Sequence, residues 1–220
     1  MTIALRTIAT AAAVVGAILA ASEPAGASGI QSTFAGGGSR VGFAVEIQST
    51  ITVPLSVQAG GWAQASGWVM DTNADTVTSY PVGYDQVGWF WSTTTGRFNV
   101  FAEHGNGSGA NVSSFDQWNG PALAPGSSVT VALDCSPWLG TVSAWYYVGD
   151  QWHAAGPTVK MPGLCVPGNW WYRYTEIDAP PGTSVLYTPV TFSGGSEIRN
   201  WSGRALADMG PLEALSPGAS

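Results

Sequence analysis

The chain has 220 residues, of which only 10% are charged, and its net charge is −7. Soluble proteins contain roughly 25% charged residues, so this composition excludes a coiled coil and a charged disordered chain. The acidic balance also gives no electrostatic attraction to nucleic acid or to an anionic membrane. The chain contains 29 glycines, 14 prolines and 11 tryptophans, which is typical of a turn-rich β protein.

Residues 1–27 have the pattern of a secretory signal peptide. Arg6 is the only charged residue before an apolar run over 8–21, and Ala25-Gly26-Ala27 supplies a small-x-small cleavage site. The run is too short to span a bilayer, which needs about 20 apolar residues. We therefore expect an exported, extracellular protein whose mature chain begins at Ser28.

Export bears on the redox state of the only two cysteines, Cys135 and Cys165. An oxidising compartment favours their pairing, and closing this loop would stabilise the fold by about 3–4 kcal/mol. Neither a CxxC spacing nor neighbouring histidines indicate a metal. We expect a disulfide, no metal and no cofactor.

Apolar and polar residues alternate with a period of two through most of the mature chain, which predicts strands. The first two runs cover residues 41–48 and 50–58. The stretch Trp89–Phe101 predicts a hairpin whose loop holds Gly96 in the left-handed conformation. The run 129–135 places its cysteine on the core side of a strand.

A second hairpin is predicted around Gly149-Asp150, where positive φ at the glycine fits a type II′ turn. Its register pairs Val148 with Gln151 and Tyr147 with Trp152, and continues in the same way to Trp145 and Ala154. Cross-strand neighbours then form a connected aromatic group on one face. The members of this group are Trp145, Tyr147 and Trp152.

Residues 169–178 alternate over a further strand, and 185–192 are the last strand candidate. Composition favours surface loops at 105–109 and 119–127. One face of the strand over 169–178 carries aromatic and carboxylate side chains, which are Trp170, Tyr172, Tyr174, Glu176 and Asp178.

Eight to eleven short strands separated by turns predict an all-β fold. The expected architecture is a single β-sandwich or jelly-roll-like domain over 28–201, with an open barrel as the alternative. The tail over 202–220 is expected to be mostly disordered, since Gly210-Pro211 interrupts its one helical stretch.

The sequence offers little support for nucleophilic catalysis or for a metal site. There are two histidines and no G-x-S-x-G motif. Glu103 and His104 are adjacent, so on a strand they point to opposite faces. Asp71, Asn73 and Asp75 have the spacing of the first ligands of a calcium loop, but the later Gly and Glu are absent.

A carboxylate pair is the remaining catalytic candidate. Glu176 and Asp178 share a strand face at a separation of roughly 7 Å. Glycoside hydrolysis uses two carboxyls about 5–9 Å apart, and the neighbouring tyrosines could stack on a sugar. The alternative is an exposed strand end running into Pro180-Pro181.

The sequence shows neither the paired-glutamate motifs of small xylanases nor the Gln and Glu motifs of fungal-type glutamic peptidases. Part of it resembles the C-terminal half of the aegerolysins, which are small lipid-binding β-sandwich proteins. The resemblance covers about fifty residues and transfers no site. It lies in the order Pro125-Gly126, Val129, Val131, Cys135, Cys165, Pro167 and Trp170-Trp171.

We therefore expect a secreted binding module for a polysaccharide or another cell-surface polymer, because flat aromatic side chains stack on neutral glycans. The alternatives are a lipid-binding β-sandwich, a hydrolase using Glu176 and Asp178 or Glu103 with His104, and a structural or partner-binding protein without a small ligand. Whether the chain is an enzyme is left open. The candidate ligand-binding residues are Trp145, Tyr147, Trp152, Trp170, Tyr172 and Tyr174.

Overall fold

The computed structural model describes residues 31–40, 44–72, 83–108, 111–161, 164, 169–199, 205–208 and 212–214. These residues form an all-β protein. Among them there is no helix long and apolar enough to cross a membrane. The predicted signal peptide and Cys165 lie outside the described residues, so export and the Cys135–Cys165 disulfide stay predictions.

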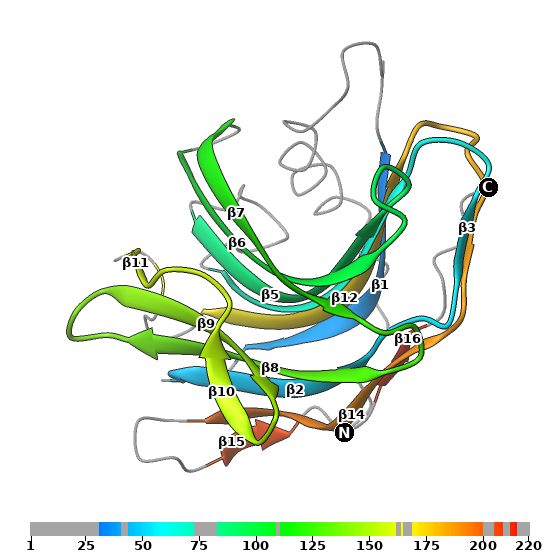
Figure 1. The fold of residues 1–220 in the computed structure, drawn as a ribbon. Coiled ribbons are helices and arrows are strands. Elements are labelled where there is room, and N and C mark those ends of the chain that lie inside the picture. Colours follow the sequence, from blue (N-terminus) through cyan, green and yellow to red (C-terminus); the bar gives the residue numbers. More distant parts are fainter. Residues whose placement is uncertain are drawn as a thin grey trace.

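The first sheet has six antiparallel strands. Their spatial order is β1 (Gln31–Arg40), β12 (Trp170–Ala179), β4 (Gln64–Thr72), β5 (Gly83–Ser92), β6 (Phe98–Ser108) and β7 (Asn111–Leu123). This sheet is strongly curved, and its concave side faces away from the second sheet (Figure 1).

The second sheet has eight strands and packs against the convex side of the first (Figure 1). Its main path is β10 (Gln151–Ala154), β9 (Thr141–Val148), β8 (Ser128–Ser136), β2 (Glu46–Thr52), β14 (Val190–Arg199) and β15 (Ala205–Asp208). In addition, β11 (Val159–Lys160) pairs with β9 and β16 (Leu212–Ala214) with β14, while β3 (Val57–Ala59) and β13 (Val185–Tyr187) form a separate ribbon.

The main hydrophobic core lies between the two sheets, as expected for a β-sandwich. Trp89 of β5 has no solvent exposure and meets the rings of Phe98 and Tyr187 edge-on, at centroid distances of 5.7 and 6.4 Å. Such edge-to-face contacts are a favoured arrangement of aromatic rings. The β8 residues Val129, Val131, Leu133 and Cys135 face this core as predicted.

A second cluster lies on the other, concave side of the six-stranded sheet. All nine residues of β4 are buried, so this strand is covered on both faces. Residues that alternate with the core positions form this cluster: Trp68, Met70, Tyr84, Phe101 and Tyr172, with Phe90 and Tyr174 packed against them.

Both predicted hairpins are present. β5 and β6 are joined by a turn in which Gly96 has a φ of 61°. The β9–β10 hairpin has the predicted register, starting from Val148 opposite Gln151. The predicted turn type is wrong, because Gly149 and Asp150 both have positive φ, 59° and 61°, which is the pattern of a type I′ turn.

The loops predicted at 105–109 and 119–127 are largely strand. β6 continues to Ser108 and β7 covers Asn111–Leu123. Gly105 serves packing rather than a turn, since a Cβ there would lie 1.8 Å from the ring of Tyr84. In the segment 202–220, where we expected mostly disorder, two short strands pair with β14.

Trp89→Ala is expected to lower the free energy of unfolding by about 3–5 kcal/mol, because it removes a large side chain from a closed core. Chemical denaturation measures this change. The matched control is Trp138→Ala, since Trp138 is 93% exposed and its loss should stay within about 0.5 kcal/mol. Equal destabilisation by both changes would contradict the observed packing.

Candidate functional site

The concave face of the six-stranded sheet brings together carboxyl and amide side chains from three strands. β-Strand alternation directs Gln86 of β5, Glu103 of β6 and Glu176 of β12 to the same side as Trp68 and Tyr84. Gln86 lies directly opposite Glu103 in the register. Each of the three polar residues is at most 1% exposed.

Glu103 is held by two hydrogen bonds to one of its oxygens. The Tyr84 hydroxyl donates to Oε1 at 2.7 Å, and Nε2 of Gln86 donates to the same oxygen at 3.2 Å. Burial raises the pKa of Glu103 to about 7, while the Tyr84 hydrogen bond, the charge of His104 and the Gln86 hydrogen bond act in the opposite direction. Glu103 is therefore protonated at mildly acidic pH.

Glu176 accepts a hydrogen bond from the indole of Trp68, with 3.1 Å between Nε1 and Oε2. Burial and the neighbouring Asp178 carboxylate raise the pKa of Glu176 well above its usual range. Glu103 is close enough to raise it further. The expectation that Glu176 and Asp178 share a face is confirmed, but both are buried rather than at an exposed strand end.

Several acceptor atoms on this face have no hydrogen-bond partner among the described residues. They are Oε1 of Gln86, Oε2 of Glu103 and Oε1 of Glu176. Buried polar atoms are paired in most native structures, and a catalytic role is one explanation for an unpaired one. Together with the raised pKa values, this arrangement is suited to transferring protons to and from a bound molecule.

The predicted aromatic residues of β12 lie beside these carboxyls. Tyr172 is buried and Tyr174 is half-buried, and their ring centroids are 5.5 Å apart. Tyr174 also contacts Trp68 at a centroid distance of 5.4 Å. The side chain of Trp170 lies outside the described residues.

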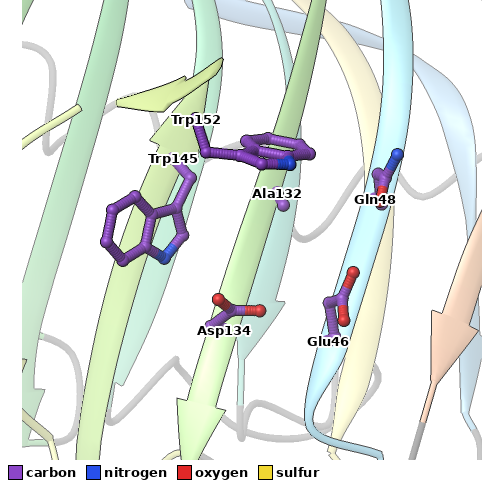
Figure 2. Close-up of a pocket in the computed structure, with 6 residues that line it drawn as sticks. All are labelled: Glu46, Gln48, Ala132, Asp134, Trp145 and Trp152. Carbon is purple, nitrogen blue, oxygen red and sulfur yellow. The ribbon is translucent and has the colours of Figure 1, made fainter. Parts of the chain in front are cut away.

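The predicted aromatic residues of the β9–β10 hairpin lie on the other sheet. Tyr147 and Trp152 are 39% and 41% exposed, with ring centroids 5.3 Å apart. Trp145 and Trp152 line a groove of about 360 Å³ on the outer face of the eight-stranded sheet (Figure 2). The other residues that line this groove are Glu46, Gln48, Ala132 and Asp134.

Glu103 and His104 point to opposite faces, as predicted. Nδ1 of His104 lies 2.5 Å from Oδ1 of Asp85 on the core side of the sheet. The possible calcium loop finds no support at its first residue, because Asp71 is fully buried in β4 and its Oδ2 lies 3.3 Å from Sγ of Cys135. The other two residues of that loop lie outside the described part of the chain.

The sequence interpretation missed Gln86, Tyr84 and Trp68 as site residues. Gln86 and Tyr84 share a face of β5, and Trp68 lies on the same face of the neighbouring strand β4. The available signal was a glutamine in a strand whose other residues are mostly apolar or aromatic. Gln86 and Glu103 lie just beyond the ends of the predicted hairpin over Trp89–Phe101, so extending its register would have paired them. Nothing in the sequence placed Trp68 and Glu176 beside that hairpin.

Because burial raises the pKa of Glu103 from its ordinary 4.5 to about 7, the folded protein binds a proton that the unfolded chain releases. The stabilisation is complete below pH 4.5 and is lost as the pH rises to about 7 and above. A shift of this size corresponds to roughly 3 kcal/mol. We therefore expect a lower melting temperature at pH 8 than at pH 4.5.

Glu103→Gln should reduce this pH dependence, because the amide does not titrate. The control is Asp116→Asn, which changes an exposed carboxylate on neighbouring β7. Melting curves of the three proteins between pH 4 and 8 make the comparison. An unchanged pH dependence in Glu103→Gln would show that Glu103 is not held protonated.

No family model and no curated protein matches the sequence. Solved structures do match the fold. Scytalido-glutamic peptidase bound to a transition state analog inhibitor has a TM-score of 0.59 and 15% identity, over 84% of this chain and 88% of the peptidase. SCP-B, a member of the Eqolisin family of peptidases in a complex with the tripeptide Ala-Ile-His, has a TM-score of 0.57 and 13% identity, over 87% of this chain and 92% of that protein.

Sheep galectin-11, with a TM-score of 0.35 and 11% identity, is also a match, but its likeness is too low to carry an argument. At the identities of the two peptidases the comparison establishes a shared fold and no more. The chain is thus a β-sandwich protein with the architecture of these peptidases.

Proposed function

We propose that the protein is a hydrolase that cleaves peptide bonds, with its reacting groups on the concave face of the six-stranded sheet. The observation that carries this proposal is that Glu176, Glu103 and Gln86 lie on one face of the sheet. The pKa values of both carboxyls are raised there above their ordinary values. The peptide substrate is suggested by the fold, which is similar to that of two peptidases.

Glu176 is the acid–base group in this proposal. Amide hydrolysis needs a base that takes a proton from the attacking water and an acid that protonates the leaving nitrogen. The carboxylate of Glu176 accepts the water proton as the C–O bond forms, and the resulting carboxylic acid gives it to the nitrogen as the C–N bond breaks. Asp178 beside it favours the form in which the two carboxyls share one proton.

Gln86 is the group that binds the carbonyl oxygen. One N–H of its amide donates to Glu103 at 3.2 Å, which fixes the side chain and leaves a second N–H for the substrate. A donor fixed before the reaction stabilises the negative charge that develops on the oxygen without reorganising. Tyr84 holds Glu103 in turn, so Glu103 is a positioning residue.

These side chains are buried in the structure. Substrate binding therefore requires a movement that opens this face. Opening would also lower the pKa of Glu176 toward its ordinary range, because burial is the largest cause of its raised value. Activity at acidic pH is the consequence, since one carboxyl of the pair must still hold a proton.

Hydrolysis of an unfolded protein substrate between pH 3 and 8 tests the proposal, with new peptide ends detected by mass spectrometry. Glu176→Gln is expected to lower the rate by about 100-fold or more, because it removes the proton-transferring group. Gln86→Leu should reduce it by a similar factor.

The matched control is Glu46→Gln, which makes the same chemical change on the other sheet and should keep full activity. Melting curves verify that each variant is folded. Absence of cleavage by the unaltered protein, or full activity in folded Glu176→Gln, would overturn the proposal.

A second candidate function is binding of an extracellular glycan, which the exposed Tyr147 and Trp152 favour. An extracellular location is part of the same inference and is supported by the signal-peptide pattern of residues 1–27. Trp152→Ala should abolish retention on insoluble polysaccharide or cell walls. Trp138→Ala, a change at an exposed tryptophan elsewhere, should retain it, and equal retention by both variants would contradict this function.

A further inference from the structure

The groove on the eight-stranded sheet is formed by the register of three adjacent strands. Ala132 of β8 lies between Gln48 of β2 and Trp145 of β9, and it is the direct neighbour of both. Because its side chain is only a methyl group, it leaves room between its larger neighbours for the Trp152 indole, and the groove lies beside that indole. Glu46 and Asp134 face each other one step further along the same two strands, β2 and β8.

Trp152 forms one wall of the groove. It lies opposite Tyr147 in the β9–β10 hairpin, and the edge-on contact between the two rings holds the indole in place. Figure 2 shows the Trp152 indole extending over Ala132, with the carboxylates at the other end of the groove. An indole that is 41% exposed offers a flat apolar surface to a ligand.

The carboxylate end of the groove is electrostatically unfavourable without a ligand. Like charges directly opposite each other on neighbouring strands destabilise a sheet. Burial and the charge of Glu46 raise the pKa of Asp134 to about 6, and the indole of Trp145 opposes them. Asp134 belongs to β8, the strand between β2 and the tryptophan-bearing strand β9, so it is the carboxylate that we assign to the ligand.

We infer that this groove binds a sugar unit that carries a protonated amine, such as the hexosamine of a polysaccharide. The sugar ring stacks on Trp152, the ammonium group lies at Asp134, and the amide of Gln48 binds a hydroxyl. A cation near an indole gains further attraction from the ring. The inference rests on the glycan-binding function above and is independent of hydrolysis on the other sheet.

The test is calorimetric binding of glucosamine oligomers at pH 7, compared with N-acetylglucosamine oligomers of the same length. Acetylation removes the charge and keeps the ring. We expect the acetylated oligomers to bind at least 10-fold more weakly. Asp134→Asn should weaken glucosamine binding by at least 10-fold and leave the weaker binding of the acetylated oligomers unchanged.

Trp152→Ala should abolish binding of both oligomers. The matched controls, Asp116→Asn on β7 and Trp138→Ala in the turn after β8, should bind normally, because both side chains are exposed and neither lines the groove. If Asp134→Asn does not fold, the pH dependence of binding tests the same charge: glucosamine binding should weaken as the pH falls below about 6, where Asp134 takes up a proton, while binding of the acetylated oligomers stays unchanged.

The possible failures are distinguishable. If both oligomers bind equally and this binding depends on Trp152, the glycan-binding function stands and recognition of the amine is wrong. If tetramethylammonium binds as tightly as the glucosamine oligomer, the inference that the groove recognises a sugar ring is wrong. Binding of none of these probes, together with no retention on polysaccharide, would overturn both the inference and the function on which it rests.

Discussion

The alternation of side chains along β4, β5, β6 and β12 is the constraint on which the rest of the structure depends. Odd positions of β4 and β5 face the sandwich core, so even positions must form a second face. In most antiparallel sheets that second face is solvated and polar. Here it is buried, and polar side chains on it have to be satisfied by one another.

That requirement explains why aromatic donors accompany the carboxyls. An ionised carboxylate is costly to bury, so a buried glutamate becomes protonated or acquires donors. Trp68 and Tyr84 combine a large apolar surface with one donor, which suits them to pack in the face and to hold Glu176 and Glu103. The same arrangement that stabilises the protonated acids makes them suited to proton transfer.

Local patterns predicted a large part of the fold. The β9–β10 register follows from a two-residue turn, and the shared face of Glu176 and Asp178 follows from strand period alone. Both are properties of a few consecutive residues. The type of the turn was wrong because Asp150 adopts positive φ, which aspartate tolerates better than most residues.

Contacts between distant strands could not be predicted in this way. Glu46 and Asp134 are adjacent through the pairing of β2 with β8, and Glu176 joins the face that carries Glu103 because β12 pairs with β4. Glycine content suggested a loop at 105–109, but the space needed by the Tyr84 ring explains Gly105 instead. Composition reports which residues are present, whereas these sites depend on which strands are neighbours.

The central claim is that two glutamates on the concave face are held protonated by their surroundings. The most direct measurement is a ¹³C NMR titration of the glutamate side-chain carboxyls, with Glu103→Gln and Glu176→Gln used to assign the two signals. We predict that Glu103 titrates near pH 7 and that Glu176 titrates well above the ordinary glutamate range. Titration of both residues near pH 4.5 would contradict the account.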